Sequence, residues 1–146
     1  MKSTIRISES PDSWEITATE LHLSQYRIGA GLELMLRQVH GEGFFSIRVS
    51  GEFNLISNGK QFKLDAEKPK EIGQVFDLLS VHISKIVISK TGEIEISFSN
   101  TDKIVVNPDP HYEAWQACIN DTHFVCSPGG GDVVVWDPKA SQLEVK

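Results

Sequence analysis

The sequence predicts a mostly β fold of the α+β class, with antiparallel sheets built from consecutive hairpins and one packed helix near residues 69–80. Two observations predict it. Most segments alternate apolar and polar residues with the two-residue period of half-buried strands, and short turn sequences separate them. Only one segment shows a clear helical period.

The clearest strand segments are FFSIRVS at 44–50 and EIEISFS at 93–99. Because apolar and polar residues alternate along each segment, we expect one face of each strand to pack into the core. The side chains expected to point inward are Phe45, Ile47, Val49, Ile94, Ile96 and Phe98. Turn sequences lie at 40–43, 58–59, 90–93 and 100–102. Asn58-Gly59 is the strongest hairpin signal, because both residues tolerate the positive φ of a type I′ turn.

Two stretches echo each other at an offset of fifty residues. Residues 35–57 and 85–107 both follow the pattern strand, glycine-containing turn, strand, short turn, strand. The echo bears on GLELMLRQV at 31–39, whose apolar residues suit a helix as well as a strand. We interpret this segment as a strand, because its counterpart in the second stretch is strand-like.

The segment PKEIGQVFDLLSV at 69–81 predicts the helix. Its apolar stripe consists of Ile72, Val75, Phe76 and Leu79, and Pro69 stands where a first helical turn tolerates proline. Gly73 in the interior costs about 1 kcal/mol relative to alanine. We therefore expect the helix to depend on packing across a sheet face.

Length and pattern predict one main domain. Residues 27–137 form a single β-rich unit, preceded by a strand-rich extension at 1–26 and followed by a tail at 138–146. The first ten residues lack the apolar segment of a signal peptide, and two cysteines are too few for a disulfide scaffold. These features predict a cytoplasmic protein.

The formal net charge of −6 disfavours binding to nucleic-acid phosphates and favours a basic partner. No apolar run approaches the roughly 18 residues that a membrane-spanning helix requires. We therefore expect neither nucleic-acid binding nor membrane insertion.

Metal-ligand residue types cluster near the C-terminus at His111, Cys118, His123 and Cys126. Their spacing does not match the close pairs of zinc sites, so we expect no metal centre and no cofactor. The ordinary interpretation is two small buried cysteines and two surface histidines. A hairpin turning at 120–121 would still bring Cys118 and His123 near each other.

Cys126 is followed by SPGGG, where backbone amides are able to stabilise an oxyanion. The simpler interpretation is a hairpin loop, in which Pro128 starts the turn and the glycines supply positive φ. The sequence thus offers no catalytic residue above background.

Trp115 and Trp136 occupy strand positions, where an indole fills the core or closes a sheet end more often than it binds a ligand. Alternation places Glu113 on the same face as Trp115 and Ala117. A carboxylate on an apolar face needs a partner, so we expect Glu113 either to hold a loop or to bind an external cation.

Several motifs together resemble a bacterial domain family of unknown function, over roughly residues 28–137. They are YEAW at 112–115, CSPGG at 126–130, VVVW at 133–136, VSGEFNL at 49–55 and GEIEISFSNTDKIVV at 92–106. The C-terminal signature residues are Tyr112, Trp115, Pro128, Gly129, Gly130 and Trp136.

The resemblance brings no catalytic residues with it. It implies a likeness to immunity proteins of polymorphic toxin systems. The leading hypothesis is a non-enzymatic cytoplasmic protein that occludes a cognate, basic toxin domain. The residues expected to contact the partner are Asp109, Glu113, Asp121 and Asp132.

Two alternatives stay open. One is a small enzyme that uses Cys126 or a metal site at His111 and His123. The other is a self-associating structural module, because sheets leave edges that pair. The sequence leaves the oligomeric state open.

Overall fold

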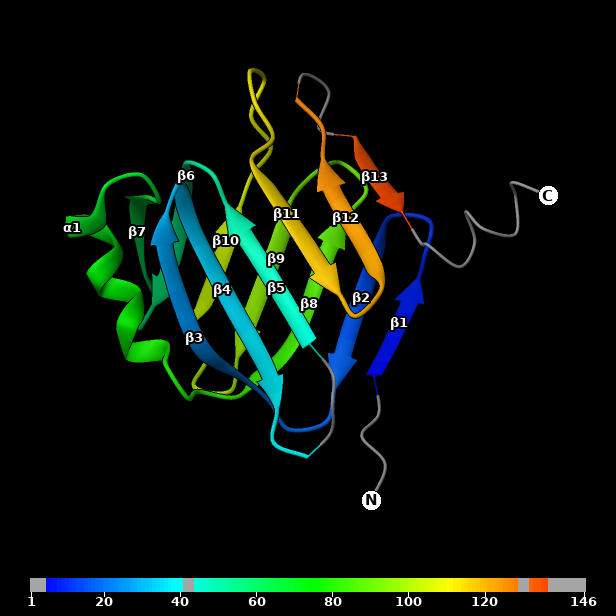
Figure 1. The fold of residues 1–146 in the computed structure, drawn as a ribbon, viewed down its shortest axis with the longest axis horizontal. Helices are drawn as coiled ribbons and strands as arrows, with labels where there is room; N and C mark the ends of the chain where they lie inside the picture. Colours follow the sequence, from blue (N-terminus) through cyan, green and yellow to red (C-terminus); the bar gives the residue numbers. More distant parts are fainter. Residues whose placement is uncertain (1–4, 41–43, 129–131, 137–146) are drawn as a thin grey trace.

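The computed structural model describes residues 5–40, 44–128 and 132–136, which form a sandwich of two antiparallel sheets (Figure 1). Sheet A has the strand order β1 (Ile5–Glu9), β2 (Ser13–Ala18), β8 (Ile83–Ser89), β9 (Ile94–Phe98), β10 (Lys103–Val106), β6 (Glu52–Ser57) and β7 (Lys60–Asp65). Sheet B has the order β13 (Val133–Trp136), β12 (Thr122–Cys126), β11 (Trp115–Ile119), β5 (Phe44–Val49), β4 (Gly31–Gln38) and β3 (Leu21–Gly29). The mostly β prediction is confirmed.

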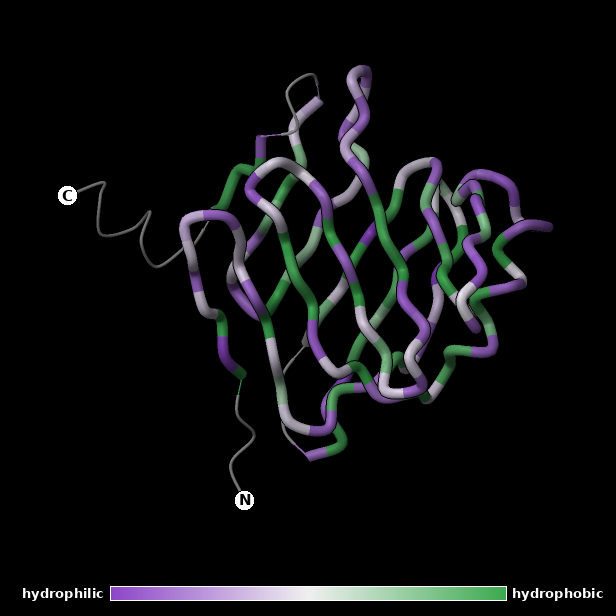
Figure 2. The backbone as a smooth tube through the Cα atoms, turned by 180° about the vertical axis from the view of Figure 1, so that it is seen from behind, coloured by the Kyte–Doolittle hydropathy of each residue, from purple (hydrophilic) through white to green (hydrophobic). Residues whose placement is uncertain are grey.

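The core lies between the sheets and is built by the predicted alternation. Hydrophobic and hydrophilic residues alternate along the strands (Figure 2). All six residues expected to point inward are buried, and the least buried of them, Phe98, is 3% exposed. The period of two therefore identified the core-facing side of β5 and β9 correctly.

The predicted turns at 58–59, 90–93 and 100–102 are present, whereas the predicted turn at 40–43 lies mostly outside the described residues. Asn58 and Gly59 have φ values of 53° and 76° and connect β6 to β7, as a type I′ turn requires. Asn120, with φ of 53°, likewise begins the turn between β11 and β12.

The ambiguous segment 31–39 contains strand β4, so the strand interpretation is confirmed. The two echoing stretches nevertheless fold differently. In the second stretch β8, β9 and β10 are neighbours in sheet A, whereas in the first β4 and β5 belong to sheet B and β6 to sheet A. The chain crosses between the sheets at residues 50–51, so the echo is one of local pattern and is not repeated in three dimensions.

The helix comprises one α-turn, α1 (Pro69–Ile72), and a 3-10 helix, η1 (Gly73–Leu78). Phe76 and Leu79 are 45% and 47% exposed, so their predicted place in the buried stripe is wrong. The buried residues are Ile72, Val75 and Leu78, because a 3-10 helix repeats every three residues.

The helix covers one side of the sandwich instead of crossing a sheet face (Figure 1). It lies beside β7, and the Tyr26 hydroxyl of β3 donates a hydrogen bond to the Val75 carbonyl. The Tyr26 and Phe76 ring centroids are 5.1 Å apart. We call this the closed side, formed by the edges β3 and β7 with α1 and η1.

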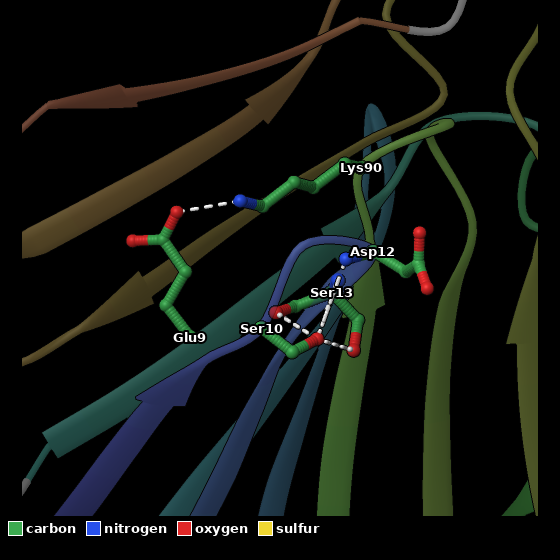
Figure 3. A network of polar contacts seen from close by, with 5 residues as sticks. All are labelled: Glu9, Ser10, Asp12, Ser13 and Lys90. Carbon is green, nitrogen blue, oxygen red and sulfur yellow. Dashed lines mark hydrogen bonds and ion pairs between the residues drawn. The ribbon is translucent and has the colours of Figure 1, made fainter.

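The opposite side, formed by the edges β1 and β13, has no covering element among the described residues, and we call it the open side (Figure 1). Here Trp14 of β2 contacts Phe124 of β12 across the sandwich, with ring centroids 5.5 Å apart. Figure 3 shows the corner between β1 and β2, where an ion pair joins Glu9 to Lys90 in the β8–β9 turn. At this corner the Ser10 hydroxyl accepts a hydrogen bond from the Ser13 N–H.

The first strands belong to the same core as the rest. β2 pairs with β8, Ile16 is fully buried, and the predicted boundary between residues 26 and 27 falls within β3. Within the described ranges, no helix is long and apolar enough to cross a membrane.

Candidate functional site

The sequence motifs converge at one end of the sandwich. We call it the upper end. It carries the connections at 10–12, 50–51, 90–93 and 107–114, together with the end of β12 and the start of β13, at the top of Figure 1. The opposite, lower end carries the turns at 58–59, 99–102 and 120–121, among others. VSGEFNL, GEIEISF, YEAW and CSPGG lie far apart in the sequence, yet each begins or ends at the upper end.

Gly92 joins three of these motifs. Its carbonyl accepts a hydrogen bond from the Trp115 indole N–H at 2.8 Å and a weaker one from the Cys126 thiol at 3.4 Å. Gly92 has φ of 108°, a value that side-chain-bearing residues rarely adopt. Trp115 and Cys126 are fully buried, so the prediction that Trp115 fills the core is confirmed.

Gly51 joins the remaining motif to the same loop. A Cβ atom at Gly51 would overlap the Tyr112 side chain, so only glycine lets Tyr112 pack against this corner. The Ser50 N–H donates to the Ala114 carbonyl at 3.0 Å, and the Ala66 N–H donates to the Gly51 carbonyl at 2.8 Å. Segment 107–114 is thereby fastened to the crossing between the sheets.

The Tyr112 hydroxyl is held between two groups. Burial raises its pKa, and the Asp109 carboxylate, which accepts its hydrogen bond, raises the pKa further. The Glu52 backbone N–H, which donates to the phenolic oxygen, opposes this shift. Asp109 also accepts the His111 N–H at 2.8 Å, so its carboxylate fixes the loop as well as facing solvent.

An open groove of about 360 Å³ lies between segment 107–114 and the strands β6 and β7. Its walls are mostly polar, and they include Glu52, Asn54, Gln61, Lys63, Asp109 and Tyr112. On the wall formed by β6 and β7, Lys63 and Glu52 form an ion pair at 2.8 Å, which raises the pKa of Lys63. Sequence reasoning missed this groove, because β6 and the loop that face each other are fifty residues apart.

Three of the four predicted partner-contact residues lie on upper-end connections: Asp109, Glu113 and Asp132. Asp121 lies in the β11–β12 turn at the lower end. Asp109 is half-buried, and the other three are exposed. The four residues are therefore not one cluster, although three of them share an end.

The predicted placement of Glu113 on the apolar face with Trp115 is wrong. Glu113 is exposed and accepts a hydrogen bond from the Gln116 side chain at 2.9 Å. The reason is that β11 begins only at Trp115, where it pairs with the last residue of β5, Val49. Alternation does not extend into the irregular segment before it.

Cys118 and His123 face each other across the β11–β12 hairpin, as the turn at 120–121 predicts. The Cys118 Sγ lies 3.7 Å from the His123 Nε2. Cys118 is half-buried, so the expectation of two buried cysteines holds only for Cys126. His111 is exposed and His123 half-buried, so the expectation of two surface histidines holds for His111.

Burial raises the pKa of both thiols, and a nearby carboxylate raises each further: Asp121 for Cys118 and Glu113 for Cys126. Both thiols are therefore protonated at neutral pH, the form that is a poor nucleophile. Among the described residues, no three histidine, cysteine or acidic side chains are grouped so that they can hold a metal ion.

The remaining signature residues are partly described. Pro128 is exposed in the β12–β13 connection, whereas Gly129 and Gly130 lie outside the described residues. The Trp136 backbone pairs with His123, and its side chain also lies outside what is described.

A family model matches residues 14–137 of the chain, and its description is DUF6188, a family of unknown function. The chain therefore belongs to this family. No curated protein and no solved structure matches the chain.

Proposed function

We propose that this member of DUF6188 is a non-enzymatic binding protein that neutralises a basic protein partner by occluding it. The more specific proposal is an immunity protein, acting in the bacterial cytoplasm against a cognate toxin domain. The observation that supports it is the upper end, where Asp109, Glu113 and Asp132 stand on connections of the sandwich.

Segment 107–114, which carries Asp109 and Glu113, is held in position by its neighbours, and the Asp132 carbonyl accepts the Ser127 N–H at 2.7 Å. Gly92 ties the start of β11 to the end of β12, and Gly51 seats Tyr112 beside Asp109. A surface that is ordered before binding loses less conformational entropy on association. Exposed carboxylates on such a surface attract a basic partner and select its orientation.

The state of the thiols favours binding over catalysis. Cys126 is fully buried, and its thiol donates to the Gly92 carbonyl. A catalytic cysteine needs an accessible thiolate, whereas here burial and Glu113 raise the thiol pKa. We therefore favour the binding protein over an enzyme that uses Cys126.

Co-expression with the product of the neighbouring gene tests the proposal. The expected result is a complex that survives purification and protection of cells from that product. The double variant Glu113→Gln/Asp132→Asn should weaken the complex by about tenfold, because removing interfacial charges slows association. Gln at position 113 keeps the acceptor for the Gln116 hydrogen bond, so the loop is preserved.

The matched control is Glu20→Gln/Asp77→Asn, which removes the same charge from exposed residues outside the upper-end connections. This variant should bind like the unchanged protein. The absence of both complex and protection would refute the proposal. Equal weakening by the two double variants would refute the assignment to the upper end.

A further inference from the structure

The four sheet edges of the sandwich differ in how they are protected. On the closed side, β3 is covered by the segment after η1, because the Ser80 N–H donates to the Leu23 carbonyl at 2.7 Å. The Leu23 N–H in turn donates to the Val81 carbonyl at 3.3 Å. The β7 edge carries Lys60, Lys63 and Asp65, charges that discourage pairing with another strand.

The two edges of the open side are also unlike each other. β1 carries Arg6 and Glu9, which protect it in the same way as β7. β13 consists of three valines and a tryptophan, with no charge and no proline. Among the described residues it pairs only with β12, and Val134 and Val135 are 54% and 41% exposed.

The register shows which backbone groups of β13 face the open edge. The Ser127 N–H donates to the Asp132 carbonyl at 2.7 Å, and Val125 pairs with Val134. Hydrogen-bonded and non-hydrogen-bonded pairs alternate along two antiparallel strands, so Val134 uses its backbone groups toward β12. The N–H and C=O groups of Val133 and Val135 therefore point to the open edge.

We propose that β13 is a self-association edge, which pairs antiparallel with β13 of a second copy of this chain. Residues that oppose each other in a sheet point to the same face, so the pleat restricts the register. Val135 pairs with buried Phe124 and points inward, and Val134 points outward. A two-fold axis through Val134 matches both: Val133 meets Val135 of the second copy, and Val134 meets its own equivalent.

This register also satisfies the exposed backbone groups. Val133 and Val135 exchange hydrogen bonds with Val135 and Val133 of the second copy, so the arrangement is isologous. Sheet B then continues across both molecules as one sheet.

The chemistry of the open side favours a second copy as the occupant. The chain carries a net charge of −6, but none of it lies in β13, so the two edges meet without like charges. Ile7 of β1 pairs with buried Ile16 and points inward, yet it is 40% exposed. Apposition of two open sides covers Ile7 and Val135 of both copies. In this register Asp132 lies at the end of the pairing, opposite Trp136 of the second copy, whereas Asp109 and Glu113 lie outside β13. The argument uses only the edge strand, so this proposal does not rest on the toxin-binding function.

Light scattering coupled to size exclusion, over about 1 to 100 µM protein, tests the proposal. The expected result is twice the mass of the chain, with dissociation on dilution. Val134→Lys should weaken the dimer by at least about tenfold, because it places two lysines opposite each other at the two-fold axis. Val134 faces solvent, so the monomer should stay folded.

The matched control is Val39→Lys, which introduces the same residue at a valine that is 51% exposed and lies after β4. It should leave the dimer unchanged. Hydrogen exchange gives a second measurement: the amides of Val133 and Val135 should gain protection as the protein concentration rises, and Val134 should be protected throughout.

If the unchanged protein stays monomeric over this concentration range, the proposal is overturned. A strand of another protein would then be the occupant to test at the β13 edge. A dimer that withstands Val134→Lys, or that Val39→Lys weakens equally, would also overturn the proposal.

Discussion

The closed and open sides of the sandwich differ in how far the apolar side chains at the margins of the sheets are covered. Both are places where the two sheets end and the core reaches the surface. On the closed side, α1 and η1 cover the opening, so Ile72 and Val75 are fully buried. On the open side, Ile7 and Val135 also point inward but remain about two-fifths exposed. Burial at the margin of a sandwich thus depends on a third element as well as on strand alternation.

This difference in burial implies different roles for the apolar side chains on the two sides. Side chains beneath the helix are already removed from water and stabilise the monomer. Side chains at the open side keep part of their apolar surface for association. We therefore expect substitutions on the closed side to change folding stability, and those on the open side to change self-association.

The largest expected effect is that of Ile72→Ala. It removes a fully buried side chain where neighbouring atoms fill the space only partly, so it should lower the free energy of unfolding by about 2–5 kcal/mol. The same change on the open side, Ile7→Ala, should cost less than about 1 kcal/mol in the monomer. Urea unfolding of both variants under dilute conditions measures the difference, and equal losses would contradict the comparison.

Tyr26→Phe should have the next largest effect. It removes the hydroxyl that donates to the Val75 carbonyl and keeps the ring that contacts Phe76. Loss of one part-buried hydrogen bond should lower the free energy of unfolding by about 1 kcal/mol. Thermal unfolding measures this loss. An unaltered stability would mean that the helix is held by apolar contacts alone.

The helix also marks where sequence reasoning reached its limit. The pairs Val75-Phe76 and Leu78-Leu79 supply apolar residues at spacings of both three and four, so the pattern fits two helix types. The backbone hydrogen bonds decide between them: the Leu79 N–H donates to the Phe76 carbonyl, and Tyr26 occupies the Val75 carbonyl. Tyr26 lies 49 residues from Val75 along the chain, so no local pattern contains this information.

The sequence likewise predicted the local parts of the candidate site but not how they come together. Local patterns identified the hairpin that pairs Cys118 with His123, and the motifs included Gly51 and Gly92. The meeting of these motifs at one end was not predictable, because alternation does not reveal which sheet a strand joins. The misplacement of Glu113 has the same origin, since the start of β11 is set by pairing with β5.

Alkaline pH should lower the free energy of unfolding through Tyr26 on the closed side. Burial raises the pKa of Tyr26, and the nearby Asp77 charge adds to this. An unfolded tyrosine ionises near pH 10 while Tyr26 stays protonated in the folded chain, so stability should decline above about pH 10. Tyr26→Phe should decline less steeply over the same range. Equilibrium unfolding at pH values around 10 measures both slopes, and parallel slopes would exclude Tyr26 as the titrating group.

The smallest expected effect is that of Glu9→Gln on the open side. The hydrogen bond and charge of Lys90 lower the pKa of Glu9, so the pair contributes stability above about pH 4.3 and loses it as the pH falls through the lower folded value. Glu9 is exposed, and Lys90 also lies 5.0 Å from the Trp14 ring centroid, a contact that does not involve the Glu9 carboxylate. We therefore expect only a slight fall in Tm at neutral pH, which added salt removes.

Glu52→Gln, which breaks the ion pair with Lys63 on the β7 edge, is the matched control. A large, salt-independent loss for Glu9→Gln alone would mean that the corner between β1 and β2 carries part of the stability that we assign to the closed side.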